Sequence, residues 1–365
     1  MNEMAELTRT PLAPRLEAEG ATLGEYHGAI VPARFADPVT EHQAVRRSAG
    51  FFDFSFRARF AAAGADHVTF LHNMLSNDVK GLAPGQGTYA TLLDVKGHIL
   101  ADLRVYRERD QIVLETDADL LAKTMQTLER YIIMDDVALR PLELSSIALQ
   151  GPRSSALLGK ILGAGTPNLD REYDHAEASL SDHESVRVVK ASNTGEDGYE
   201  IWADAGTVAH VWEALRDARS DFEASPCGTE ALETLRIEAG IPRYGAELGE
   251  DTLPLEAGLL NALSFTKGCY IGQEIVERTR SRGHVNWMLA GFFVQADAPP
   301  PMGEKLFLEG KEIGEITSAC ISPTLRKTIA LGYVRREASD PGTRLALSPG
   351  SLAEVTQLPF YRARS

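Results

Sequence analysis

Thr194-Gly195-Glu196-Asp197-Gly198 joins two largely apolar runs, Val186–Ala191 before it and Tyr199–Ala203 after it. Short runs rich in β-branched and aromatic residues favour β-strands. The two glycines permit the positive backbone angles that a tight turn between strands needs. The stretch therefore predicts a hairpin. Taken as a residue type alone, Glu196 at its tip is an ordinary turn residue.

A second strand–turn–strand unit lies earlier in the chain. Thr88–Asp94 and Ile99–Tyr106 flank Lys96-Gly97 and predict another hairpin. Asp102 lies in its second strand, where alternation turns it to the face opposite its two apolar neighbours. The residue is either an ordinary outward carboxylate or a group that acts on a ligand.

Helical patterns alternate with these strands. The predicted helices are Asp66–Leu75, Leu120–Ile133 and a segment that begins near Thr229 and stops at Gly240. Beyond Pro299-Pro300-Pro301 the chain shows only short strands separated by turns. This order predicts an α+β protein that ends in an all-β region.

We expect three units along the chain. Residues 1–145 form an N-terminal α+β unit, and residues 146–285 form a second one that starts near Gly151-Pro152. Residues 286–365 form the final β unit. A chain of 365 residues, 44% of them apolar, is long enough for two or three domains.

Lys267-Gly268-Cys269-Tyr270-Ile271-Gly272-Gln273-Glu274 carries the most chemistry. It predicts a thiol two residues from an ammonium at the start of a helix, where unpaired N–H groups favour a thiolate. Cys269 and Lys267 are therefore candidate catalytic residues. In the alternative reading, Cys269 is a small buried residue, the glycines make a turn, and Gln273 and Glu274 begin a helix.

Composition and charge exclude several classes of protein. The longest apolar run, Trp287–Val294, is too short to cross a bilayer, so we expect no membrane span. A net charge of −15 argues against stable binding to nucleic acid. Three widely separated cysteines encode neither a disulfide framework nor a metal site, which fits a cytoplasmic protein.

Other signals are weaker. Arg278, Arg280, Arg282 and His284 form a cationic cluster that is either a solvated face or a site for a carboxylate or phosphate. The chain lacks a Gly-x-Gly-x-x-Gly motif, a Walker loop and a Gly-x-Ser-x-Gly elbow. We predict no metal site. Tyr89, Tyr244 and Trp287 are either core residues or stacking partners for a flat heterocycle.

Several strings along the chain are specific. They are Phe51-Phe52-Asp53-Phe54-Ser55, Gly64-Ala65-Asp66 through Asn77-Asp78-Val79, Leu149-Gln150-Gly151-Pro152, Thr194–Glu200, Leu235-Arg236-Ile237-Glu238-Ala239-Gly240 and Ile321-Ser322-Pro323. On these strings the chain resembles the glycine-cleavage T-protein superfamily nearly end to end. The Lys267–Glu274 motif is similar to the hallmark of its YgfZ-type folate-binding branch.

The resemblance implies a fold and a ligand. It implies a three-domain cloverleaf around a central channel that takes tetrahydrofolate, with a C-terminal β-barrel-like domain packed alongside. It also implies that chain order and domain order interweave.

Site residues follow from the same resemblance. Glu196 matches the family glutamate that hydrogen-bonds the pterin, and Tyr89 matches an aromatic residue beside the folate. Asp102 matches the aspartate near the folate nitrogen that accepts a methylene group. Arg236 and Trp287 complete the folate-binding set that we expect.

The chain also departs from the T-protein pattern. It has Ala101-Asp102 where T-proteins usually have an Asp-Asp pair, and Leu232-Glu233 where they have an Arg-Asp pair. The second change removes a fixed donor fork for the ligand.

The leading hypothesis is a YgfZ-like, tetrahydrofolate-binding protein that supports iron–sulfur cluster assembly or repair, and thereby cluster-dependent tRNA-modifying enzymes. Cys269 would be its working thiol, and iron–sulfur proteins or a carrier protein would be its partners. The alternative is a folate-dependent aminomethyl- or methyltransferase that uses Asp102. A third reading is a folate-binding partner protein without chemistry of its own.

Overall fold

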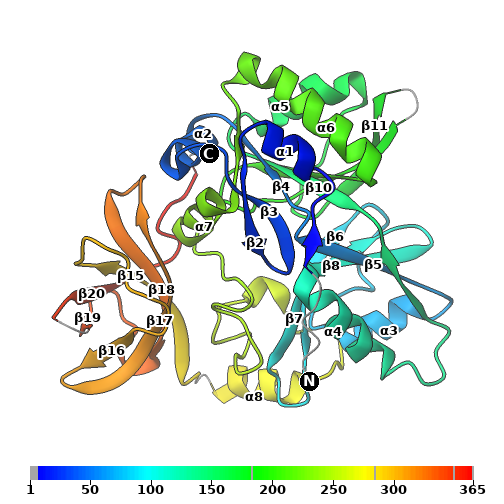
Figure 1. Ribbon diagram of the computed structural model, residues 1–365. Coiled ribbons are helices and arrows are strands. Elements are labelled where there is room, and N and C mark those ends of the chain that lie inside the picture. The colour runs from blue at the N-terminus through cyan, green and yellow to red at the C-terminus, as the bar shows by residue number, and fades with distance from the viewer. Residues whose placement is uncertain (1–6, 182–183, 283–284, 348–349, 364–365) are drawn as a thin grey trace.

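The computed structural model describes residues 7–181, 184–282, 285–347 and 350–363. Figure 1 shows two α+β parts, one above the other, with a β-barrel beside them. This arrangement confirms the predicted α+β class and the C-terminal barrel. Among the described residues, no helix has the length and apolar character needed to span a membrane.

The upper part is built on a six-stranded sheet with the order β11-β12-β13-β10-β4-β14. Its strands are β11 (His175–Ser181), β12 (Glu184–Lys190), β13 (Gly198–Ala203), β10 (Ser145–Gln150), β4 (Gly50–Asp53) and β14 (Ser225–Cys227). The antiparallel pairing of β12 with β13 confirms the first predicted hairpin.

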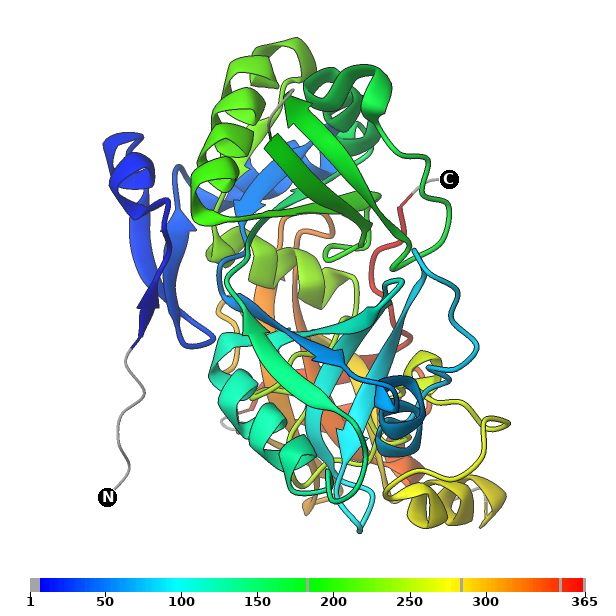
Figure 2. The same cartoon turned by 90° about the vertical axis from the view of Figure 1, so that its right-hand side faces the viewer.

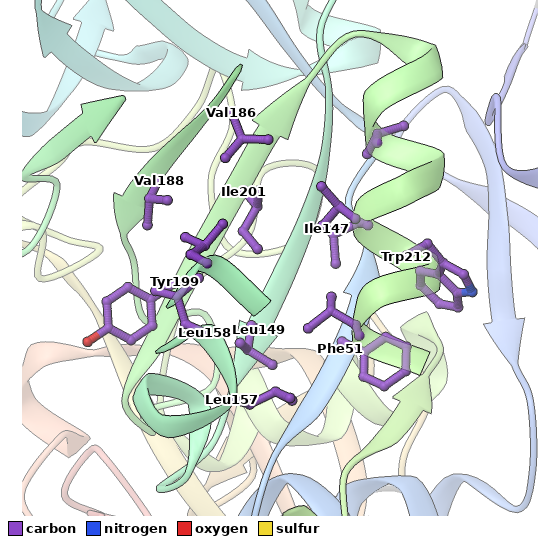
Figure 3. Close-up of a cluster of buried hydrophobic side chains, with 14 of the residues drawn as sticks. Phe51, Ile147, Leu149, Leu157, Leu158, Val186, Val188, Tyr199, Ile201 and Trp212 are labelled. Carbon is purple, nitrogen blue, oxygen red and sulfur yellow. The ribbon is translucent and has the colours of Figure 1, made fainter. Parts of the chain in front are cut away.

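Two helices, α5 (Ser154–Leu162) and α6 (Ala205–Ala218), pack against this sheet. Figure 3 shows their contact with it, where Trp212 of α6 lies beside Phe51 of β4, at a ring-centroid distance of 4.9 Å. Both side chains are fully buried. Because burying a large apolar side chain contributes about 1.5–3 kcal/mol, this cluster fixes the helices on the sheet.

The lower part is a five-stranded sheet with the order β6-β7-β8-β5-β9. Its strands are β6 (Gly87–Leu93), β7 (Ile99–Arg107), β8 (Gln111–Asp117), β5 (Arg57–Ala63) and β9 (Ala138–Leu142). The pairing of β6 with β7 confirms the second hairpin. Helices α3 (His67–Met74) and α4 (Ala118–Glu129) bury Leu71 and Leu120 against this sheet.

The barrel closes in the order β15-β18-β17-β16-β19-β20. Its strands are β15 (Trp287–Val294), β18 (Lys327–Arg335), β17 (Lys311–Ser322), β16 (Lys305–Leu308), β19 (Arg344–Ala346) and β20 (Leu352–Thr356). Closure leaves no free sheet edge in this part.

The remaining elements connect the parts. β1 (Thr8–Arg9), β2 (Thr22–Tyr26) and β3 (Ala29–Arg34) form a small sheet that carries α1 (Ala13–Ala18). Figure 2 shows the β2–β3 hairpin along one side of the molecule with its turn next to α4, where the Asp119 N–H donates to the His27 carbonyl at 3.3 Å.

Helices α2 (Pro38–Arg47) and α7 (Thr229–Glu238) lie beside each other, and α8 (Gln273–Arg282) follows the Cys269 motif. Chain order and spatial order cross, as expected. β4 lies between β10 and β14, whereas Leu248 and Tyr270 pack with Leu93 on the lower part. The linear boundaries at residues 145 and 285 stay predictions.

Candidate functional site

A cavity of about 620 Å³ lies where the parts meet. Its walls come from the lower sheet, the β2–β3 turn, the segment after α7, β15 of the barrel and the chain near the C-terminus. The residues that carry the argument below are Tyr26, His27, Arg57, Tyr89, Asp102, Arg104, Asp117, Glu172, Tyr173, Leu232, Arg236, Arg243 and Tyr244. A volume of this size is typical of small-molecule sites.

Asp102 faces this cavity from the middle of β7. The alternation of the strand turns it away from the buried Ala101 and Leu103, as the sequence predicts. Its Oδ2 accepts a hydrogen bond from the Tyr89 hydroxyl at 3.0 Å, whereas its buried Oδ1 has no hydrogen-bond partner among the described residues. Burial, followed by the charge of Asp117, raises the pKa of Asp102. The cavity thus contains a buried carboxylate with a free oxygen.

Tyrosines form the aromatic walls. The rings of Tyr89 and Tyr173 are 6.5 Å apart with a 24° tilt, and Tyr244 lines the cavity as well. Burial raises the pKa of Tyr173 to about 12. These phenols therefore stay neutral donors, and their faces suit a flat ring.

A row of alternating charges crosses the sheet floor. Arg104 lies opposite Glu115, which lies opposite Arg59. Glu115 accepts from Arg59 Nε at 3.0 Å, Arg57 Nε at 3.0 Å and Arg104 Nη1 at 3.1 Å. Burial alone would raise the pKa of Glu115, but these three arginines lower it to about 2. The positive charge of the floor is therefore largely compensated.

The β2–β3 turn contributes His27, which sequence reasoning missed. Arg243 Nη1 lies 3.1 Å from its Nε2, and Asp117 Oδ2 lies 3.2 Å from its Nδ1. An arginine can only donate, so Nε2 accepts and we infer that Nδ1 carries the proton toward Asp117. Donor atoms of His27, Asp117 and Asp119 lie within 4.8 Å of one another. We interpret this group as hydrogen-bonded rather than metal-binding, since Nδ1 is used as a donor.

Arg236 lines the cavity but is fully engaged. Its guanidinium donates to Glu233 Oε2 at 2.7 Å and to Glu247 Oε2 at 3.0 Å. Tyr26 Oη also donates to Glu233, at 2.5 Å. Leu232 lies in the cavity wall, so the departure from the Arg-Asp pattern falls inside the site. The cavity keeps its arginines paired with glutamates of the chain.

Two other expected ligand residues lie elsewhere. Glu196 is buried and accepts from Arg46 Nη1 at 3.0 Å, outside the cavity wall. Trp287 begins β15 and stacks under Arg335, with the guanidinium 4.1 Å from its ring centroid, and it does not line the cavity either. The structure brings together Tyr89, Asp102 and Arg236; contacts of Glu196 and Trp287 with folate stay predictions.

The Lys267–Glu274 motif has a different geometry from the one predicted. Helix α8 begins at Gln273, four residues after Cys269, so the thiol is outside its first turn. Lys267 Nζ donates to the carbonyls of His72 and Leu75 at the end of α3 and lies 4.8 Å from the Tyr270 ring centroid. Burial lowers the pKa of Lys267 to about 8. Its ammonium therefore caps the C-terminal end of a distant helix, and the activation of Cys269 by Lys267 stays a prediction.

Other motif residues are placed by the same turn. Gly268 and Gly272 have φ of 101° and 80°, which glycine adopts readily. Cys269 and Glu274 are exposed, and Arg278 pairs with Glu274. Arg280 lies over the Phe265 ring at 4.0 Å. The side chain of Arg282 and all of His284 lie outside the described residues.

The missed residues His27, Asp117, Tyr173 and Glu172 share a cause. Each of them lines the cavity because the fold brings together segments that are far apart in the sequence. The one usable signal was strand register, which sets Asp117 across from Asp102 once the β7–β8 pairing is assumed.

Comparisons with known proteins match both parts of this architecture. Residues 12–267 match the family described as the GCVT N-terminal domain, and residues 288–362 match the glycine cleavage T-protein C-terminal barrel domain. The chain belongs to the glycine cleavage T-protein family. The aminomethyltransferases of this family use tetrahydrofolate as substrate or cofactor.

Similar T-proteins span the whole chain. The aminomethyltransferase of Bacillus subtilis strain 168 is 30% identical over 98% of this chain and 99% of its own length. That of Cutibacterium acnes is 32% identical over 98% and 100%. The crystal structure of aminomethyltransferase T from Bartonella henselae superposes with a TM-score of 0.89 at 28% identity, over 98% of this chain and 99% of that one. The narrower YgfZ-type assignment gains no support from these names.

Proposed function

We propose that this T-protein family member is a folate-dependent aminomethyltransferase in which Asp102 is the catalytic residue. The observation that carries the proposal is Asp102 in the cavity wall, whose buried Oδ1 has no hydrogen-bond partner within the described part of the chain. A buried acceptor without a partner costs stability, so its retention in a cavity points to a ligand that donates to it.

The walls fit tetrahydrofolate. Tyr89 and Tyr173 offer aromatic faces to a flat ring system, and Asp102 offers an acceptor to its N–H groups. Glu172 also lines the cavity, and its Oε1 accepts a hydrogen bond from the Ser192 N–H at 2.8 Å. When bound, tetrahydrofolate supplies the nitrogens that take up the one-carbon unit.

The protein contributes position and proton transfer. The Tyr89 hydroxyl donates to Oδ2 of Asp102 and fixes this carboxylate in the cavity wall. A carboxyl with a raised pKa takes up and returns a proton more readily near neutral pH than an ordinary aspartate does. A protonated Asp102 can therefore deliver its proton to the leaving amine and then, as a carboxylate, accept one from the nucleophilic nitrogen.

The test is formation of methylenetetrahydrofolate from an aminomethylated carrier protein under reducing conditions. Loss of one general acid–base group typically lowers the rate by about 10²–10⁴-fold, so we expect a loss of this size in Asp102→Asn. The control is Asp110→Asn, an exposed carboxylate that does not line the cavity. No product with the wild-type protein would refute the proposal.

A second candidate function rests on Cys269, whose thiol is exposed beside α8. In this reading the protein supports iron–sulfur cluster assembly, and a second subunit or an external thiol completes any cluster site, since one cysteine cannot hold it. The comparisons give this role no support. It predicts that Cys269→Ala, but not Asp102→Asn, fails to restore cluster-enzyme activity in a bacterium that lacks its own YgfZ-type protein.

A further inference from the structure

Two carboxylates, those of Asp102 and Asp117, line the same cavity close enough for the charge of one to act on the other. Extending the antiparallel register from the Arg104–Glu115 pair by two residues would place Asp102 across from Asp117. A hydrogen bond of 3.1 Å from Thr116 Oγ1 to the Asp102 carbonyl holds the strands together at this point. Like charges directly opposite each other in a sheet are destabilising, so this pair has an energetic cost.

The two carboxylates have unequal partners. Asp117 lies opposite Arg57 on its other side, and Arg57 Nη1 donates to its Oδ1. His27 Nδ1 lies 3.2 Å from its Oδ2, and in the tautomer inferred above it carries the proton that points toward this oxygen. Asp102 receives only the neutral Tyr89 hydroxyl, and no described cation donates to it. When one proton is shared between two such groups, it resides on the one with the fewer cationic donors.

We propose that Asp117 is a positioning residue whose fixed negative charge, held by Arg57 and His27, keeps a proton on Asp102. The role of this proton in the transfer reaction rests on the proposed function, whereas the effect of Asp117 on Asp102 does not. Asp117 need not touch the reacting atoms. It acts through Asp102, and His27 links the β2–β3 turn to the same charge.

Other groups around Asp102 raise or lower its pKa. Arg57 of β5, Arg104 of β7 and the Tyr89 hydroxyl of β6 favour the ionised form. Tyr244, from the segment after α7, also feels the charge of Asp102. Burial and Asp117 together outweigh these groups. Removing Asp117 therefore leaves Asp102 with mainly cationic neighbours.

The experiment is a pH titration of the aspartate carboxyl carbons by NMR, in ¹³C-labelled, folate-free protein. The Asp102 signal is assigned from its absence in Asp102→Asn. In the wild type we expect Asp102 to titrate above the ordinary value of about 3.9. In Asp117→Asn its midpoint moves to lower pH, and in Asp110→Asn, a control at an exposed aspartate outside the cavity wall, it stays where it is.

A second variant tests the same balance in the other direction. Tyr89→Phe removes the hydroxyl that favours the ionised form, so the Asp102 midpoint moves to higher pH. Because this change keeps the buried ring, it is informative even if Asp117→Asn does not fold. A wild-type Asp102 that titrates in the ordinary range, or a midpoint unmoved in a folded Asp117→Asn, overturns the inference.

The functional arm separates the two proposals. If the wild type forms methylenetetrahydrofolate, the pH profile of the rate in Asp117→Asn shifts in parallel with the NMR midpoint. If the NMR midpoint shifts but no product ever forms, the charge coupling stands and the proposed function fails. If product forms but the NMR midpoint does not move, the proposed function stands and the charge coupling fails.

Discussion

At the scale of single residues, Lys267 shows how a buried charge can be used for structure. Its Nζ donates hydrogen bonds to the carbonyl oxygens of His72 and Leu75 at the end of α3. Last-turn carbonyls have no partner within the helix, so a lysine there satisfies what the helix cannot. The sequence motif suggested a thiol-activating role because Cys269 is two residues away. The carbonyl groups that Lys267 contacts are 195 and 192 residues away in the chain. The sequence around Lys267 therefore gives no indication of them.

Lys267→Met tests this capping role. The change leaves two carbonyls without a donor, which costs about 1–3 kcal/mol in the free energy of unfolding. We expect urea denaturation to show this loss, while the rate of Cys269 alkylation stays the same. Lys80→Met, at an exposed lysine nearby, is the control. A fall in the alkylation rate without loss of stability would restore the thiol-activating role.

The pH dependence of the same variant follows from burial. Burial lowers the pKa of Lys267 from 10.5 to about 8. Between these values the unfolded chain binds the proton more than the folded protein does, so this residue's contribution to stability increases with rising pH. The wild type gains relative to Lys267→Met across that window, and the difference disappears if the ammonium is in fact solvated.

At the scale of elements, the sheet floor is held by one carboxylate among three arginines. Glu115 of β8 is fully buried and accepts from Arg57, Arg59 and Arg104. Removing one partner from a buried ionic network costs about 3–5 kcal/mol, because the remaining charges are left uncompensated. We expect Glu115→Gln to lose about this much stability in urea denaturation, and Glu177→Gln, at an exposed glutamate, to lose almost none.

Acid denaturation tests whether the ionised Glu115 carboxylate stabilises the folded protein. Because the pKa of Glu115 is lowered from 4.5 to about 2, its contribution is present above about 4.5 and is lost as pH falls toward 2. The stability of the wild type should therefore fall faster than that of Glu115→Gln over this range. Parallel curves would mean that the arginines do not hold this carboxylate.

The elements also show what sequence reasoning can reach. The two hairpins were predicted correctly, and so was the face of Asp102, opposite to that of Ala101 and Leu103, because turn chemistry and two-residue alternation are local properties. The position of Asp117 depends on strand register, and that of His27 depends on a turn packed against α4. Neither of these positions can be predicted from a short stretch of sequence.

At the scale of the whole molecule, one cavity draws on every part of the fold. Tyr89 and Asp102 come from the lower sheet, His27 from the N-terminal hairpin, Leu289 from the barrel and Leu358 from the chain beyond it. The family resemblance correctly implied this arrangement of parts. The pairing of Glu196 with Arg46, outside the cavity wall, was not foreseen, because a shared string does not reveal its partners.

This shared lining makes ligand binding a global event. A ligand that binds only the folded state stabilises it by about 2.7 kcal/mol at a hundred times its dissociation constant. We expect tetrahydrofolate to raise the melting temperature and to slow amide exchange together in the β2–β3 turn, in β6–β7 and in residues 240–244. Slower exchange follows because each segment must open before its amides exchange, and the bound ligand spans all three. Protection confined to one segment would show that the cavity is not the binding site, and Leu352→Ala, a partly exposed barrel position away from it, should leave the pattern unchanged.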